Sequence, residues 1–166
     1  MALWGITQVP YTTTPTHRIG DDELTRAIHA YKIPLQAIVV VDNTFAIPDS
    51  EWWLRFNPDF QNLAVKLGYR YKPEIEDCDD FSRLYSLIAQ HTFRLQYQDH
   101  AYPVLVGEFY YAPDKLRPTD PRVCHAVNIV GLWQDGKLCF MFIEPNGGIP
   151  IRLSTREIES CYYVRF

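Results

Sequence analysis

The sequence of 166 residues has no long hydrophobic run, no cysteine pair at CxxC spacing and no surplus of positive charge. Its longest apolar stretch, PLQAIVVVD, is too short to cross a bilayer, and residues 1–10 lack the basic start and apolar centre of a signal peptide. A formal net charge of -4 without a local Lys/Arg cluster disfavours nucleic-acid binding. These absences predict a protein that binds neither membrane nor nucleic acid.

Cysteine is scarce and scattered, because the chain has only Cys78, Cys124, Cys139 and Cys161. A chain of this length can stabilise itself through its core, so a disulfide framework is not expected. The pattern predicts reduced thiols and a cytoplasmic location. Zinc binding is disfavoured, since the only adjacent ligand pair, Cys124 and His125, is expected to point to opposite faces of a strand.

The remaining composition is that of a globular protein, with 47% hydrophobic residues. Neither repeats nor a linker divide it, so a single domain over residues 1–166 is predicted, with residues 1–19 as a possible arm. Apolar spacing predicts helices over residues 21–32, 49–56, 57–68 and 77–91, and then strands over residues 102–111, 122–133 and 137–145. Helices followed by an antiparallel sheet define an α+β fold.

A tight hairpin is predicted at Asp135-Gly136, a dipeptide typical of two-residue turns. The turn pairs Gln134 with Lys137, and continuing this register places Glu144 opposite Val127 and Asn146 opposite His125. Either Glu144 or Asn146 is then within reach of the His125 imidazole. Such a partner fixes the tautomer and orientation of a histidine ring.

Cys78 lies in the sequence DCDDF, just before an apolar helical pattern. If Asp77 is the N-cap, Cys78 is the first residue of the helix, where the partial positive charge of the helix terminus favours a thiolate. A cysteine there and a histidine with a polar partner are the components of a nucleophilic triad of Cys78, His125 and Glu144 or Asn146.

The aspartates around Cys78 oppose a thiolate unless a cation neutralises them. Asp79 and Asp80, together with Glu144 or an oxygen of the EPNGG loop, offer the hard oxygen ligands that Ca²⁺ prefers. We therefore expect a Ca²⁺ site at Asp79 and Asp80, with no other cofactor.

Each of these residues also has a simpler interpretation. Cys78 continues an apolar stripe and fits a small core residue, His125 fits a hydrogen-bonded core histidine, and the aspartates fit a solvated capping cluster. The triad interpretation depends on all of them occurring together. Trp52, Trp53 and Trp133 are candidates for the wall of a cleft, although core packing explains most of the aromatic content.

The motifs DCDDF, HAVNIV and FIEPN resemble those of the papain-like cysteine protease domain at the C-terminus of the fairy-ring mushroom agglutinin and of its single-domain phage and bacterial relatives. The resemblance covers residues 31–149. It implies a papain-like or transglutaminase-like fold, Cys78 as the nucleophile, His125 as the general base and Glu144 as the third member. It also implies Ca²⁺ binding by Asp79 and Asp80, and by Asn146, where the fungal motif has a different amide.

The predicted function is therefore a calcium-dependent cysteine peptidase acting on amide bonds of a peptide or protein substrate. The alternatives are an amidase or transglutaminase-type acyl transferase and an inactive binding module, such as a phage accessory protein. One departure from the family weakens the peptidase assignment: the segment before Cys78, YKPEIED, has no glutamine for an oxyanion hole. Gln61 is the nearest upstream glutamine.

Overall fold

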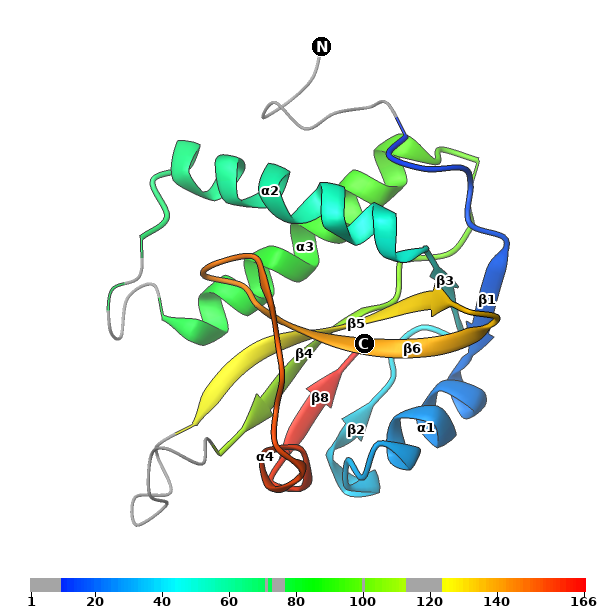
Figure 1. Ribbon diagram of the computed structural model, residues 1–166, viewed down its shortest axis with the longest axis vertical. Helices are drawn as coiled ribbons and strands as arrows, with labels where there is room; N and C mark the ends of the chain where they lie inside the picture. The colour runs from blue at the N-terminus through cyan, green and yellow to red at the C-terminus, as the bar shows by residue number, and fades with distance from the viewer. Residues whose placement is uncertain (1–9, 71, 73–76, 100, 113–123) are drawn as a thin grey trace.

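The computed structural model describes residues 10–70, 72, 77–99, 101–112 and 124–166 and has the predicted α+β class. Residues 113–123, which include the first two residues of the strand predicted over residues 122–133, lie outside them, as do residues 1–9 of the predicted arm. Within the described residues the chain forms four α-helices and one short 3-10 turn (Figure 1). The helical segments are α1 (Asp21–Ala30), η2 (Leu35–Ala37), α2 (Ser50–Lys66), α3 (Cys78–Gln96) and α4 (Thr155–Glu159). The strands are β1 (His17–Gly20), β2 (Ile38–Val39), β3 (Thr44–Ile47), β4 (Val106–Tyr111), β5 (His125–Gln134), β6 (Lys137–Glu144), β7 (Ile149–Ile151) and β8 (Tyr163–Arg165).

Helix α2 is one continuous helix, whereas the sequence predicts two, over residues 49–56 and 57–68. Asp49 caps it by accepting a hydrogen bond of 3.0 Å from the Trp52 backbone N–H. Pro58 lies inside the helix, and Asn57 is buried and accepts a hydrogen bond of 2.6 Å from the Tyr85 hydroxyl. The prediction failed because Asn-Pro resembles a helix start, while the apolar stripe of α2 continues across it.

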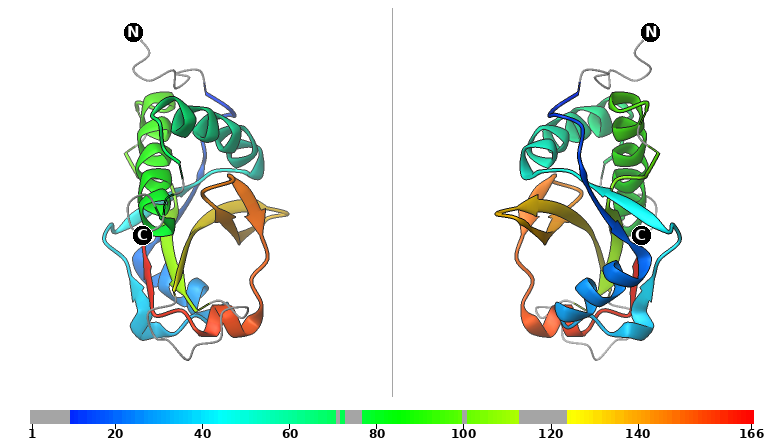
Figure 2. Two further views of the ribbon diagram at one scale, coloured as in Figure 1. Left: turned by 90° about the vertical axis from the view of Figure 1, so that its left-hand side faces the viewer. Right: turned by 90° about the vertical axis from the view of Figure 1, so that its right-hand side faces the viewer.

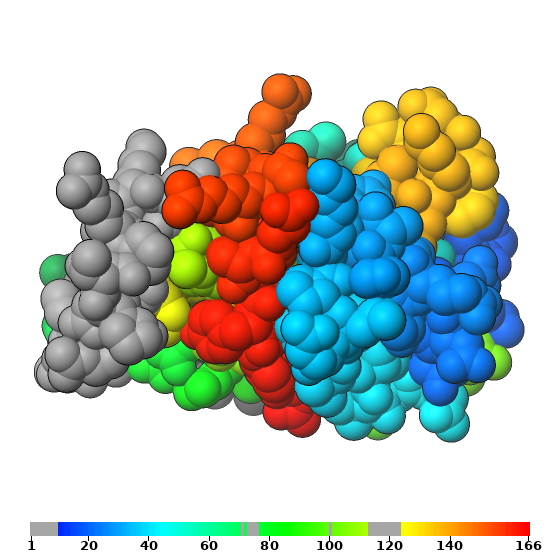
Figure 3. Space-filling view, turned by 90° about the horizontal axis from the view of Figure 1, so that it is seen from below, coloured from blue at the N-terminus to red at the C-terminus, as the bar shows by residue number. Residues whose placement is uncertain are grey.

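Six strands form the main sheet in the order β2-β8-β4-β5-β6-β7, and β1 pairs with β3 in a separate ribbon. The sheet is mixed and not wholly antiparallel, because β2 pairs in parallel with β8. Figure 3 shows this contact from below, where residues near β2 (cyan) adjoin the C-terminal segment (red). A sequence pattern does not predict this pairing because it joins two short strands from opposite ends of the chain.

The β5–β6 hairpin has the predicted register, with Gln134 opposite Lys137 and Asn128 opposite Ile143. Asp135 and Gly136 both have positive φ, at 51° and 76°, as a type I′ turn requires. The ladder ends at Asn128 and Ile143, so His125 and Asn146 are not a paired position.

Two hydrophobic cores lie on opposite faces of the sheet. Helices α2 and α3 cover one face, and α1 covers the other (Figure 2). Trp52 and Trp53 are fully buried under α2 and do not line a cleft. Among the described residues no helix is both long and apolar enough to cross a membrane.

Candidate reactive-thiol site

The site forms where the N-terminus of α3 meets the start of β5 and the end of β6 (Figure 1). Cys78 is the first residue of α3, with Asp77 at the N-cap position as the sequence predicts. His125 begins β5, and its Nε2 lies 2.8 Å from Glu144 Oε2 at the end of β6. A hydrogen bond also joins the His125 and Cys78 side chains. The structure therefore brings the three predicted residues Cys78, His125 and Glu144 together.

The two hydrogen bonds change the charge that His125 carries. The bond with Cys78, followed by the bond with Glu144, raises the pKa of His125 to about 10, although partial burial opposes this. The imidazole is then charged at neutral pH and donates from both nitrogens. An imidazolium cannot accept the thiol proton, so at pH 7 His125 places a positive charge beside Cys78 and does not act as a free general base.

Two tyrosines that were not predicted as part of the site lie near it. The Tyr111 ring is buried, and its centroid lies 5.8 Å from that of His125. Burial raises the pKa of the Tyr111 hydroxyl, and the charges of Glu157, Glu144 and Cys78 add to the effect. Tyr162 is more exposed and hydrogen-bonds to the Cys124 side chain. An aromatic in a strand gives no sequence signal that separates these roles from core packing.

The acidic residues around Cys78 form a compact cluster. Asp77, Asp79 and Asp80 each offer a carboxylate oxygen, and these atoms lie within 4.8 Å of one another. The hydrogen bond between the Asp77 and Asp79 carboxyls lowers the pKa of Asp77 and raises that of Asp79, as expected for a shared proton. Asp77 Oδ1 is buried and has no hydrogen-bond partner among the residues that the structure describes.

A cation of the protein itself already neutralises part of this cluster. Arg83, one turn along α3, lies 3.0 Å from Asp79 and 3.9 Å from Asp80. It also lies 3.9 Å from Glu108 of β4. Sequence analysis missed Arg83, although its i,i+4 and i,i+3 spacing from the two aspartates was a usable signal.

The other predicted partners have different positions. Asn146 is exposed, and its backbone N–H makes a 3.4 Å hydrogen bond to Glu144 Oε1. Glu144, and not Asn146, is therefore the residue hydrogen-bonded to His125. Gln61 of α2 donates from Nε2 to the Pro145 carbonyl at 2.9 Å and so anchors the loop that follows Glu144.

Asn128 joins the two elements that carry Cys78 and His125. It is fully buried, and its Nδ2 lies 3.0 Å from the Ser82 carbonyl, 2.9 Å from Ser86 Oγ and 3.2 Å from the Gly107 carbonyl. Its Oδ1 is buried and finds no hydrogen-bond partner within the described part of the chain. A polar residue in the apolar run HAVNIVGLW was the sequence signal for this contact, and it was missed.

No protein-family model and no curated protein matches this chain. Ten chains of solved structures do. They include a complex of PSL1a with E64, and the Polyporus squamosus lectin bound to a human-type influenza-binding epitope, Neu5Acα2-6Galβ1-4GlcNAc. Their TM-scores are 0.64 and 0.65, with 14% sequence identity in each case. Each covers 90% of this chain, which spans only 50% and 49% of the two matched chains. At this identity the likeness defines a shared fold.

These comparisons contradict the predicted family and activity. The similar solved structures are those of a lectin, whereas the three motifs predict a papain-like protease domain. The prediction of a calcium-dependent cysteine peptidase is therefore wrong, and so are its papain-like alternatives. The descriptions of the protein as a hydrolase and as a thiol protease are wrong as well. The motifs describe a local arrangement of thiol, imidazole and carboxylate, and such an arrangement does not define what the whole protein binds.

Proposed function

We propose that Cys78 is a nucleophilic thiol that forms a covalent bond with an electrophilic ligand. The observation that carries the proposal is the position of His125, hydrogen-bonded on one side to Cys78 and on the other to Glu144. The N-terminus of α3 adds a partial positive charge at the same sulfur. The proposal concerns the reactivity of this thiol and makes no claim of peptide hydrolysis.

The chemistry follows from the charges. The Sγ thiolate donates an electron pair to an electrophilic carbon, a C–S bond forms, and the leaving group departs with its bonding electrons. The imidazolium of His125 stabilises the thiolate beforehand and offers its proton to the departing group. Glu144 keeps the ring oriented and its positive charge favoured.

The test is the rate of carboxamidomethylation by iodoacetamide, in which iodide is the leaving group, followed by mass spectrometry at pH 5.5 to 9. We expect Cys78 to react at least tenfold faster than the exposed Cys124 below pH 7, and His125→Ala to abolish this advantage. Cys124 is a control within the same chain. Equal rates for both thiols, or no effect of His125→Ala, would contradict the proposal.

Calcium binding remains a separate proposal at the same end of α3. Oxygen donors from Asp77, Asp79 and Asp80 suit a hard cation, and Asp77 enlarges the ligand set predicted from Asp79, Asp80 and Asn146. Arg83 competes for these carboxylates, so we expect Arg83→Ala to bind Ca²⁺ more tightly than the unaltered chain. Titration calorimetry measures this directly, and absence of heat in both proteins would exclude the site.

Carbohydrate binding is a second candidate, favoured by the lectin title of a similar structure. This chain spans about half of that lectin, so the trisaccharide is a proposed ligand here. Saturation-transfer NMR with Neu5Acα2-6Galβ1-4GlcNAc should then show transfer to the sugar protons. Maltotriose is the control sugar. Equal saturation transfer to both sugars, or no transfer at millimolar concentration of the sialylated trisaccharide, would contradict this candidate.

A further inference from the structure

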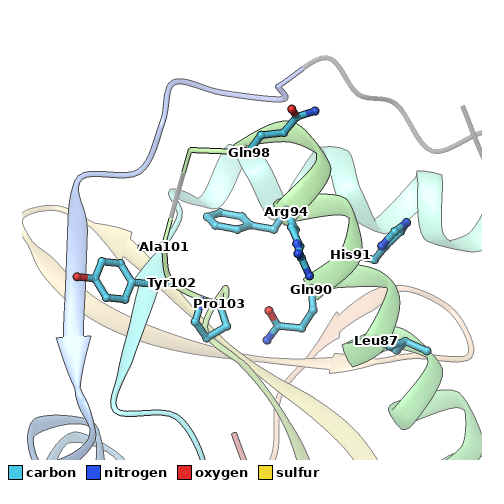
Figure 4. A pocket seen from close by; sticks show the side chains of 9 residues that line it. Leu87, Gln90, His91, Arg94, Gln98, Ala101, Tyr102 and Pro103 are labelled. Atoms are coloured by element: carbon cyan, nitrogen blue, oxygen red, sulfur yellow. The ribbon is translucent and has the colours of Figure 1, made fainter. Parts of the chain in front are cut away.

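A groove lies between the C-terminal half of α3 and residues 101–103 (Figure 4). Its volume of about 550 Å³ falls within the range of about 300–1,000 Å³ typical of small-molecule sites. Cys78 and Arg94 lie at opposite ends of α3, about 24 Å apart along the axis at a rise of about 1.5 Å per residue. The groove is therefore distinct from the thiol site.

Arg94 provides the positive charge of the groove. Figure 4 shows its side chain running along the groove side of α3 toward Gln90, whereas the His91 ring points away from the groove. Within the described part of the chain no carboxylate forms an ion pair with Arg94. A cation in the last turn of a helix also complements the helix dipole, but this role does not require the guanidinium to lie over a groove.

Gln90 forms a rigid floor beneath Arg94. Its Nε2 donates to the Val104 carbonyl at 2.9 Å, and its Oε1 accepts from the Val104 N–H at 3.1 Å. One of its amide hydrogens stays free after these bonds. This Gln90 amide hydrogen and the Arg94 guanidinium make the polar side of the groove rich in hydrogen-bond donors. Such a surface suits a ligand that only accepts hydrogen bonds.

The other walls limit the kind of ligand. Leu87, Phe93 and Pro103 supply apolar surface, so the body of the ligand can be partly nonpolar. Tyr102 lies on the wall opposite the helix, and Arg18 stacks over its ring at 4.5 Å. The Arg94 guanidinium above Gln90 carries one positive charge. Its paired N–H groups have the right geometry to bind a carboxylate, which is planar and singly charged.

We infer that this groove binds the carboxylate of a small acidic ligand through Arg94, with Gln90 as an auxiliary donor. The inference does not depend on Cys78 chemistry. Two carboxylate probes represent its possible sources: N-acetylneuraminate, an acidic sugar, and benzoate, an apolar acid. Inorganic phosphate and N-acetylglucosamine are the controls for charge alone and for a neutral sugar.

The experiment is an NMR titration of the full chain, labelled with ¹⁵N, with each probe. At least one carboxylate should give saturable shifts in the second half of α3 and near Tyr102, and whichever probe binds identifies the ligand type. Arg94→Gln should raise its Kd at least tenfold. Arg94→Lys keeps the positive charge but loses the paired N–H donors of the guanidinium, so it should raise the Kd less than Arg94→Gln does. Arg55→Gln on α2, an exposed arginine paired with Glu51, should change Kd less than twofold.

Three results would overturn the inference: no saturable shift with either carboxylate, equal shifts with phosphate or the neutral sugar, or unchanged affinity in Arg94→Gln. Arg94 is exposed, so the variant should fold, and its thermal midpoint verifies this. The iodoacetamide rate of Cys78 in the same variants should stay unchanged. Failure of the groove and failure of the thiol proposal are therefore distinguishable.

Discussion

At the scale of single residues, the charge of His125 depends on its two neighbours more than on its burial. The hydrogen bonds with Cys78 and Glu144 raise the pKa, while desolvation lowers it. The result is a pKa of about 10 at a side chain that remains 30% exposed. The imidazolium is therefore stabilised by named partners, each of which can be removed separately.

Glu144→Gln should lower the pKa of His125, because a neutral amide no longer attracts the imidazolium. In the unaltered protein the raised pKa stabilises the fold fully below the unfolded value of about 6.5, and this stabilisation is lost as pH rises toward about 10. The free energy of unfolding of Glu144→Gln should therefore decrease less between pH 6 and pH 9 than that of the unaltered protein. NMR titration of the imidazole protons and urea unfolding at both pH values measure these effects.

Glu51→Gln is the matched control for this variant. Glu51 is exposed and pairs with Arg55 at the surface of α2, so its loss should leave the pKa of His125 unchanged. Equal pKa values of His125 in the unaltered protein and in Glu144→Gln would show that the 2.8 Å contact does not control its charge.

At the scale of elements, the site requires α3 and β5 to keep a fixed relative position. Asn128 supplies this link with donors to two residues of α3 and one of β4, and Ser82 Oγ donates to the Val127 carbonyl at 3.2 Å. These contacts begin two residues after His125, at Val127, and four residues after Cys78, at Ser82. A shift of the helix against the sheet therefore has to break them first.

Asn128→Ala should destabilise the protein by about 1–3 kcal/mol, because buried acceptors on α3 and β4 lose their donor. It should also slow alkylation of Cys78, since the helix start can then move away from His125. Urea unfolding and the iodoacetamide rate measure the two effects. Asn146→Ala, at an exposed asparagine, should change neither; a similar change in both variants would argue against a specific role for Asn128.

Much of this organisation could be predicted from local patterns. The hairpin register follows from Asp135-Gly136, and it places both Glu144 and Asn146 within reach of His125 without choosing between them. The helix start at Cys78 follows from the change to apolar spacing. The parallel β2–β8 pairing and the contacts of Asn128 could not be predicted, because they depend on tertiary positions.

At the scale of the whole molecule, β5 contacts both cores, and at Gly131 it packs closely against the segment that precedes β4. The Gly131 N–H donates to the Leu105 carbonyl at 3.0 Å, and the Gly131 carbonyl accepts from Trp53 Nε1 at 3.0 Å. A Cβ at this position would overlap the Leu105 side chain, which is fully buried and has no room to move. The close approach of three segments therefore requires a glycine.

Gly131→Ala should lower the free energy of unfolding by about 1–3 kcal/mol through overpacking. Gly136→Asn is the matched control: the turn residue has open space around its Cβ position, and asparagine tolerates its φ of 76°. That variant should lose less than about 1 kcal/mol, the order of a glycine's conformational advantage. Urea unfolding of both proteins decides the matter. If Gly131→Ala is as stable as Gly136→Asn, the loop before β4 can yield, and the packing of β5 between the two cores is looser than the structure implies.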